Sequence, residues 1–189
     1  MRSKLAPHVS SSRSDRANRP DELLDLVDER DRVIGTVRKG PTERDPSLYH
    51  REIAILIHRG HELLWQLRGS SKTVMPLTWD LACAGHVGAG DEPQAAAHRE
   101  LREELGFDVE LTALERRLVR EPRETYFAYV FAGAAPNGLE PVLDPDEVAA
   151  VEWCDEAGYR RWRADGRTLG PVACELSEAF WAKRWRLHP

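Results

Sequence analysis

Short apolar segments alternate with polar turns along most of the chain and predict a domain built largely of strands. Residues 53–58 form a continuous apolar run, which is typical of a central strand buried on both faces. A turn at Arg59 and Gly60 leads to a second strand at residues 62–67, so these two strands should form a hairpin. Further strands are predicted at residues 79–84, 125–131 and 147–154, and residues 109–119 have the mixed polarity of a strand followed by a bend.

Polar, proline-rich and charged segments separate these strands and mark the remaining elements. Residues 21–38 are predicted to form two short strands around a turn at residues 29–31, followed by loops at residues 40–47, 68–75 and 134–145. Helices are predicted at residues 155–164 and 172–187, and the aromatic residues of the second helix should pack in the core rather than stack on a ligand: Phe180, Trp181 and Trp185. Residues 1–20 are rich in serine and arginine, so we expect a disordered tail ahead of a single domain at residues 21–189.

One amphipathic helix follows a glycine-rich loop in the middle of the chain. Its expected span is residues 92–105, because Pro93 suits the first turn and Gly106 suits the left-handed conformation that ends a helix. Apolar residues recur every four positions from Ala97 to Leu105 and form a stripe that can pack on a core. Strands interleaved with this helix and two closing helices predict a mixed α/β layer fold.

A second face of the same helix is acidic. Glu100, Glu103 and Glu104 lie at i, i+3 and i+4, where like charges destabilise a helix by roughly 0.2–0.5 kcal/mol per pair unless something offsets them. Arg99 and Arg102 offset part of this repulsion, and a divalent cation would offset more, since Mg²⁺ takes oxygen ligands. Acidic helix faces are usually only solvated, but the glycine-rich loop at fixed spacing before this one favours a metal site.

The segment from Gly85 to Phe107 resembles the Nudix box. That motif runs Gly, five residues, Glu, seven residues, Arg-Glu-aliphatic, one residue, Glu-Glu, one residue, Gly-aliphatic. Gly85 matches the first position, and the later positions are matched by Arg99, Glu100, Leu101, Glu103, Glu104 and Gly106. Asp91 stands where the motif has Glu, and Phe107 stands at the last apolar position. Asp91 shortens a side chain that helps to hold the loop–helix corner in the family, so its role here is less defined.

The resemblance implies a Nudix-type α/β/α sandwich around a mixed β-sheet. It also implies metal-dependent hydrolysis of a diphosphate linkage in a nucleoside diphosphate derivative or a related compound. The catalytic residues carried over from the box are Arg99, Glu100, Glu103 and Glu104. In the family the three glutamates and the carbonyl of Gly85 bind the metal, Mg²⁺ or Mn²⁺, and Arg99 is expected to orient a glutamate.

Residues outside the box are also candidates for the site. Arg68 and Lys72 follow a predicted strand and could reach a substrate phosphate, although lone basic residues are more often solvated. Glu147 is a candidate substrate-binding residue from a distant loop, and it could also accept the proton of the attacking water.

Residues 23–153 further resemble the branch of the superfamily that includes isopentenyl diphosphate isomerase and its hydrolase-like relatives. The isomerase has a catalytic cysteine directly before the Gly-His of its box, where this chain has Ala84. Cys83 lies one residue earlier and should point to the opposite face of its strand. The acidic face of the box is intact here and degenerate in the isomerase, so the sequence favours a hydrolase.

The isomerase also has a metal site made of histidines and glutamates outside the helix. His50, His86 and Glu124 match part of that set, but Glu43 stands where a further histidine is expected. We therefore interpret both histidines as hydrogen-bonded structural residues. An isomerase-like enzyme and a non-catalytic, nucleotide-binding Nudix module are the alternative functions.

Composition narrows the classes of partner. The net charge is −5, whereas a nucleic-acid-binding protein needs a basic face, so we expect a small-molecule diphosphate substrate and no nucleic acid. The chain has no apolar run of about 18 residues that would predict a membrane helix, and its first residues lack the apolar segment of a secretory signal. Three separated cysteines give no zinc pattern and suit a reducing, cytoplasmic location. A homodimer is left open, since relatives in the family often dimerise.

Overall fold

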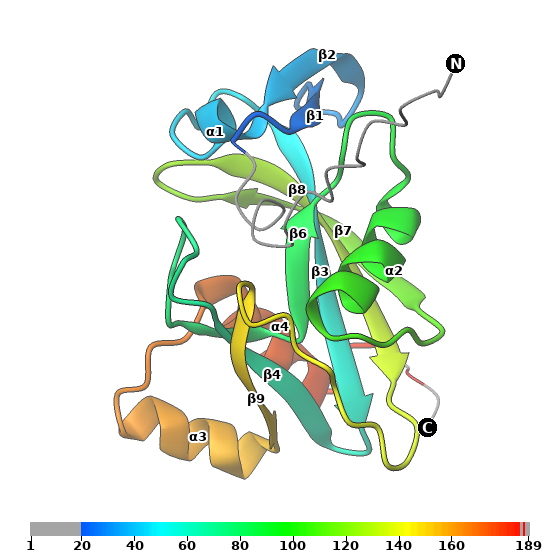
Figure 1. Ribbon diagram of the computed structural model, residues 1–189, viewed down its shortest axis with the longest axis vertical. Coiled ribbons are helices and arrows are strands. Elements are labelled where there is room, and N and C mark those ends of the chain that lie inside the picture. Colours follow the sequence, from blue (N-terminus) through cyan, green and yellow to red (C-terminus); the bar gives the residue numbers. More distant parts are fainter. Residues whose placement is uncertain (1–19, 186, 188–189) are drawn as a thin grey trace, which may run out of the picture.

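A twisted mixed sheet forms the centre of this computed structural model, which describes residues 20–185 and residue 187 (Figure 1). Among these residues, the seven strands of the sheet are β3 (His50–Arg59), β4 (Glu62–Arg68), β5 (Trp79–Leu81), β6 (Cys83–His86), β7 (Thr112–Arg120), β8 (Thr125–Ala134) and β9 (Val148–Cys154). Helix α2 (Pro93–Glu104) lies on one face, and α3 (Glu156–Ala164) and α4 (Pro171–Trp181) lie on the other. The predicted α/β/α sandwich around a mixed sheet is confirmed.

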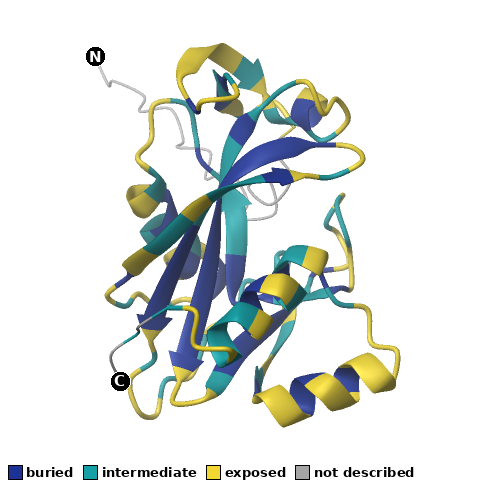
Figure 2. Cartoon of the chain, turned by 180° about the vertical axis from the view of Figure 1, so that it is seen from behind, coloured by how far each residue is buried: buried dark blue, intermediate teal, exposed yellow. Residues whose placement is uncertain are grey.

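Strand β3 lies at the centre of the sheet and pairs with three neighbours. It runs parallel to β8, with His50 beside Tyr126, and antiparallel to β4 and β6. Strand β4 extends the sheet through β5 and β9, and β7 pairs with β8 on the other side. The continuous apolar run within β3 fits this position, because both faces of the strand are covered (Figure 2).

Alternate side chains of β3 enter two separate apolar cores, because successive side chains of a strand point to opposite faces. The odd-numbered residues of the segment 53–57 pack under α2 together with Leu101. The even-numbered residues pack on the opposite face against Trp162 of α3 and Leu176 of α4. The apolar stripe predicted for the central helix therefore faces a core, and its other side is left for the acidic residues.

A separate two-stranded hairpin, β1 (Leu23–Val27) and β2 (Val33–Arg38), lies beyond the end of the sheet at which β3 begins (Figure 1). Its turn is fixed by Asp31, which has a φ of 64° and a buried side chain. The Asp31 carboxylate accepts hydrogen bonds from Nε of Arg51 at 2.6 Å and Nη1 of Arg116 at 2.9 Å. The hairpin is thereby tied to β3 and β7, and the predicted pair of strands is confirmed.

The structure differs from the prediction in two segments. Residues 40–47 are not wholly a loop, because a short helix, α1 (Lys39–Thr42), forms at their start and the Thr42 hydroxyl donates to the Lys39 carbonyl at 2.8 Å. The single strand predicted at residues 79–84 is two strands, β5 and β6. The break lies at Ala82, because the chain there changes its pairing partner from β4 to β3.

The C-terminal helix is shorter than the predicted span of residues 172–187. It ends at Trp181, because Lys183 adopts a left-handed φ of 55°. The aromatic residues at this end still pack on the core under α3 and α4, as predicted. Most of the tail predicted at residues 1–20 lies outside the described residues. Within the described residues, no helix is long and apolar enough to cross a membrane.

Candidate active site

Helix α2 ends at a fixed position relative to the segment that leads into β9. Gly106 follows the helix with a φ of 71°, which glycine adopts without strain, and so ends it where the sequence predicts. The backbone N–H of Val142 donates to the carbonyl of Leu105 at 2.8 Å, and that of Asp144 donates to the carbonyl of Glu104 at 3.0 Å. These bonds satisfy carbonyls that a helix C-terminus leaves without intrahelical partners.

A cavity of about 720 Å³ opens beside α2. Its walls come from β4, the loop after β4, β6, α2 and the segment before β9. It is lined by every residue that the sequence predicts for the site, namely Arg68, Lys72, Gly85, Arg99, Glu100, Glu103, Glu104 and Glu147. The fold therefore brings the candidates from outside the box together with those inside it.

Glu100 and Glu104 lie one turn apart on α2 and are withdrawn from solvent. Their side chains are 15% and 3% exposed, whereas that of Glu103 is 43% exposed. Burial raises the pKa of Glu100 to about 8, and the charge of Glu104 acts in the same direction. Burial likewise raises the pKa of Glu104. The positive charge near Glu100 is therefore too small to offset its burial and the repulsion from Glu104, and the pKa of both carboxyl groups lies above the usual range.

Arg99 contacts the glutamates that the sequence predicts it to orient. Its Nη1 lies 2.6 Å from Oε1 of Glu100 and 3.5 Å from Oε2 of Glu103, and its Nη2 donates to the His86 carbonyl at 3.4 Å. Gly85 leaves room for the carboxylate on the other side, because a Cβ there would lie 3.0 Å from Cδ of Glu100. The guanidinium and the missing side chain together hold the Glu100 carboxylate against β6.

Lys72 and Glu147 meet at the opposite side of the carboxylate cluster. Nζ of Lys72 forms an ion pair with Glu147 and lies 3.8 Å from Oε1 of Glu104. The second oxygen of Glu104 accepts a hydrogen bond from Nε2 of Gln66 at 3.3 Å. Lys72 and Glu147, which lie outside the box, thus contact protein groups of the cluster. Their contact with a substrate stays a prediction.

Arg68 is held at the cavity wall by two groups of the protein. Its Nε and Nη2 donate to the Val74 carbonyl at 3.2 and 3.0 Å, and its Nη1 lies 3.8 Å from Oδ2 of Asp80. Burial raises the pKa of Asp80, although the charge of Arg68 opposes this. The guanidinium is therefore fixed in position by its own surroundings, and its predicted substrate contact also stays a prediction.

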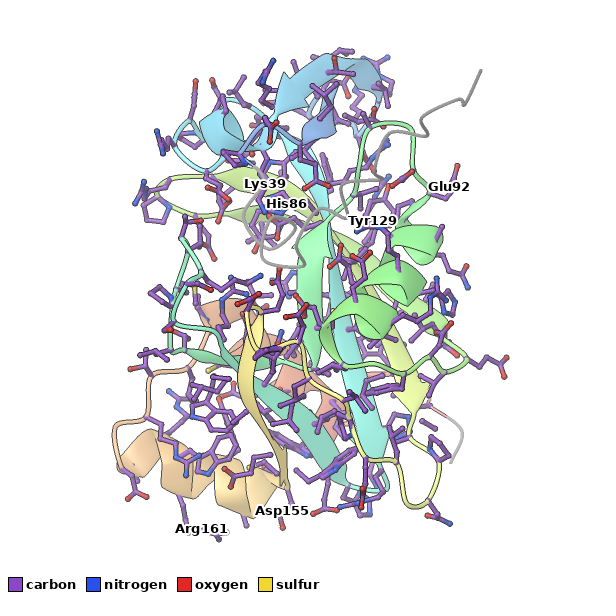
Figure 3. The ribbon with its side chains drawn as sticks, viewed as in Figure 1. Lys39, His86, Glu92, Tyr129, Asp155 and Arg161 are labelled. Atoms are coloured by element: carbon purple, nitrogen blue, oxygen red, sulfur yellow. The ribbon has the colours of Figure 1, made fainter. Side chains whose placement is uncertain are left out.

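A second group of titratable residues lies near the start of β3, where Glu52 and His86 line the same cavity and His50 is buried behind them. Nε2 of His50 and Nε2 of His86 lie 3.1 and 3.3 Å from the same oxygen of Glu52, and the two rings stack with centroids 5.2 Å apart. Nε2 of His86 nevertheless has no hydrogen-bond partner among the described residues. Lys39, which follows β2, lines the cavity together with His86, and its charge acts on the His86 ring (Figure 3). One ligand atom from each of the three residues lies within 4.8 Å of the others, so this cluster could hold a metal.

The ionisation of this histidine cluster depends on Glu52. Burial opposes the charge of Glu52, but its two imidazole neighbours outweigh burial and lower its pKa. Burial likewise opposes protonation of His50, but the hydrogen bond with Glu52 outweighs it and raises the pKa of His50. Burial lowers the pKa of His86 to about 3. Burial also raises the pKa of the nearby Glu124 to about 8, and the charge of Glu52 acts in the same direction.

The two residues before Gly85 face in opposite directions, as the alternation of a strand requires. Ala84 lines the cavity. Cys83 is buried in the core under α2, where burial raises the pKa of its thiol well above the ordinary value. The prediction that Cys83 points to the face opposite Ala84 is confirmed, and that face is the one under α2, where the Cys83 thiol donates a hydrogen bond to Glu104. The position directly before Gly85 offers no thiol.

Three polar residues at or beside this site are missed by the sequence analysis. Glu52 and Asp80 line the cavity, and Gln66 bonds to Glu104. The signal that marks them is a polar residue inside a strand with buried neighbours, since such a group needs a partner. The identity of each partner depends on strand register, as for Glu52, which lies opposite His86 in the β3–β6 pair.

Comparisons with known proteins agree with this geometry. The model of the NUDIX domain family matches residues 48–170. Isopentenyl-diphosphate Delta-isomerase 2 of Photorhabdus laumondii is 34% identical over 140 residues, which cover 70% of this chain and 77% of that protein. Nudix hydrolase 3 of Arabidopsis thaliana is 35% identical over 160 residues, 75% of this chain but only 20% of that protein.

Solved structures share the fold. A crystal structure of a Deinococcus radiodurans protein has a TM-score of 0.71 at 23% identity, covering 83% of this chain and 98% of that one. The MutT NUDIX hydrolase from Burkholderia pseudomallei has a TM-score of 0.58 at 23% identity, covering 69% and 96%.

Proposed function

The chain belongs to the Nudix family, and on this premise we propose that it hydrolyses the diphosphate linkage of a small molecule in a metal-dependent reaction. The observation that carries the proposal is the pair of buried carboxylates, Glu100 and Glu104, at one wall of the cavity. Relatives in this branch carry either hydrolase or isomerase names. The intact acidic face of α2 favours the hydrolase.

The residues present fit a divalent cation. Mg²⁺ and Mn²⁺ prefer carboxylate and carbonyl oxygens, and Glu100, Glu103 and Glu104 supply carboxylates beside the Gly85 backbone. The raised pKa values of Glu100 and Glu104 reflect burial and mutual repulsion that a cation would relieve. A bound cation would polarise the phosphoryl group and lower the pKa of a bound water.

The chain's own side chains then have distinct roles. Glu100, Glu103 and Glu104 would hold the cation, and Arg99 positions Glu100 through its 2.6 Å contact. The proton of the attacking water goes to one of the carboxylates that line the cavity, of which Glu147 is the candidate outside α2. Arg68 presents a fixed positive charge at the wall, which suits a phosphate group.

An isomerase-like function is the second candidate, and the histidine cluster supports it. His50, Glu52 and His86 bring together donors that suit a metal, and several relatives are named isopentenyl-diphosphate isomerases. Ala84 weighs against this function, because the resemblance places the catalytic cysteine of the isomerase at that position. Assaying Ala84→Cys beside the wild type for isomerisation of isopentenyl diphosphate tests the point directly. Isomerisation by the wild type would favour the second candidate.

The deciding experiment is a hydrolysis screen with Mg²⁺ or Mn²⁺. The panel holds nucleoside di- and triphosphates, dinucleoside polyphosphates, sugar nucleotides, coenzyme A and isopentenyl diphosphate. Glu103→Gln is the control, because Glu103 is the most exposed of the three glutamates and its substitution should leave the fold intact. We expect product that depends on the metal and is lost by orders of magnitude in the control. Equal turnover by the control would refute the ligand assignment.

A further inference from the structure

A positively charged side chain already lies inside the carboxylate cluster. Nζ of Lys72 pairs with Glu147 and lies 3.8 Å from Oε1 of Glu104, and the side chain is only 12% exposed. Both glutamates carry roles in the proposed reaction. The ammonium of Lys72 therefore lies against carboxylate oxygens of Glu104 and Glu147 that a divalent cation in this cluster would also approach.

We propose that Lys72 is an internal counter-ion that competes with the divalent cation for Glu104 and Glu147. Cation binding displaces its ammonium from these carboxylates into the cavity, and cation release lets it return. The inference rests on the proposed metal site on α2, and it adds a residue that sets how tightly the cation binds. A positive charge this close to a ligand oxygen repels a divalent cation strongly, because burial leaves little water to screen the pair.

The way in which the two basic side chains are held makes Lys72 the one that can move. Arg68 gives two nitrogens to the Val74 carbonyl and approaches Asp80 with a third. Lys72 has a flexible stem and a compact ammonium that contacts the carboxylates of Glu104 and Glu147. Loss of those partners to a cation frees Lys72, whereas Arg68 keeps its backbone acceptor.

The backbone around Lys72 is anchored independently of its side chain. The N–H of Gly69 donates to the Glu147 carbonyl at 2.7 Å, and the hydroxyl of Ser71 donates to the Asp146 carbonyl at 2.7 Å. The loop after β4 therefore stays attached to the segment before β9 when the ammonium leaves. Displacement is thus a change of one side chain, which keeps it rapid and reversible.

Cation affinity in purified, metal-free protein tests the proposal. Mn²⁺ binding is measured by electron paramagnetic resonance and by calorimetry for wild type and Lys72→Met, with circular dichroism to confirm folding. We expect Lys72→Met to bind Mn²⁺ roughly tenfold more tightly, a change of about 1.4 kcal/mol. Lys39→Met is the matched control, because Lys39 lines the same cavity on the side of the histidine cluster, and its affinity should stay near that of the wild type.

The outcomes separate this proposal from the proposed function. Equal or weaker Mn²⁺ binding by Lys72→Met, with tight binding by the wild type, overturns the counter-ion alone. Absence of Mn²⁺ binding from every variant overturns both. Equal tightening in Lys72→Met and Lys39→Met also overturns the proposal, because it assigns the effect to the general charge of the cavity.

The accessibility of the ammonium gives a second, independent readout. Lysine acylation is followed by peptide mass spectrometry with and without Mn²⁺, with Lys183 as an internal reference. We expect saturating Mn²⁺ to speed acylation of Lys72, because displacement removes it from its carboxylate partners. Slower or unchanged acylation of Lys72 in the presence of Mn²⁺ contradicts displacement.

Discussion

The two titratable clusters of the cavity are buried alike but differ in their balance of charge. On α2, the neighbouring carboxylates of Glu100 and Glu104 repel each other, and burial raises the pKa of Glu100 to about 8. At the start of β3, Glu52 lies between two imidazoles, and these outweigh burial and lower its pKa. The neighbours of Glu100 do not stabilise its ionised form enough to offset burial, whereas His50 and His86 do so for Glu52.

The contrast shows that burial alone does not decide whether a buried acid is ionised. The neighbours decide it, and they also decide whether the cluster has a use for an external cation. The α2 cluster gains ionisation from a divalent cation. In the histidine cluster, Glu52 already has two imidazole neighbours within 3.3 Å, so a cation binding there would have to displace existing contacts.

The sharpest way to separate the clusters is to remove one carboxylate from each. We expect Glu100→Gln to lower metal-dependent hydrolysis by about a hundredfold or more, comparable to losing a key electrostatic group of an active site. Glu52→Gln should lower the rate of the same hydrolysis far less. Steady-state turnover of both variants on one hydrolysable substrate measures the difference, and the reverse order would move the reactive centre to the histidine cluster.

A smaller loss is expected when the positioning of a ligand is disturbed. Arg99→Gln removes the 2.6 Å contact to Glu100 but keeps the carboxylate itself. Turnover should fall by about tenfold, in the range typical of residues that orient metal ligands, with weaker Mn²⁺ binding. Arg160→Gln, which removes only an exposed helix pair with Glu156, serves as the control. Equal activity of Arg99→Gln and Arg160→Gln would show that Arg99 does not position Glu100 for turnover.

The pH dependence of stability should have a characteristic sign for the α2 cluster. The folded protein holds a proton on Glu100 up to about pH 8, while the unfolded chain loses it near pH 4.5. Stability of the metal-free protein should therefore fall between these values as pH rises. Glu100→Gln should reduce that fall by a few kcal/mol at most, since a pKa difference of one corresponds to about 1.4 kcal/mol. Urea unfolding of both proteins between pH 5 and about 8 measures it, and identical slopes would contradict the raised pKa.

The smallest expected effect belongs to Glu52 and has the opposite sign. Because its pKa is lowered in the folded state, its contribution is present above pH 4.5 and is lost as pH falls through the folded value. Glu52→Gln should therefore make stability less sensitive to acid. Unfolding midpoints measured below pH 4.5 test this. If Glu52→Gln were as sensitive to acid as the wild type, the lowered pKa of Glu52 would not contribute to the acid sensitivity of the protein.

Local pattern was enough to predict the frame and one of the two clusters. The box residues Arg99–Glu104 share one helix, so their spacing in sequence fixes their spacing in three dimensions, and Gly85 lies in β6, from which a short loop leads directly to that helix. The same holds for the buried run of β3, whose apolar pattern reflects helices on both faces. Such features need no knowledge of which strands become neighbours.

The histidine cluster could not be predicted in the same way. Glu52 faces His86 only through the register of β3 and β6, and the alternation pattern of a strand does not name its partner. Lys72 and Glu147 likewise pair through two loops that are distant in sequence. The ionisation of both sets depends on these non-local contacts, so the sequence gives the residue types without their charge states.

The parallel pairing of β3 with β8 has a consequence for how the protein reaches this structure. His50 lies beside Tyr126, and the chain between them includes the helix and four other strands. Contacts so distant in sequence form late, because the intervening chain must first be ordered. Until β8 arrives, β3 with its apolar segment has an open edge, which is the kind of surface that associates with other chains. A strand that lines the cavity is therefore also a segment open to association with other chains during synthesis.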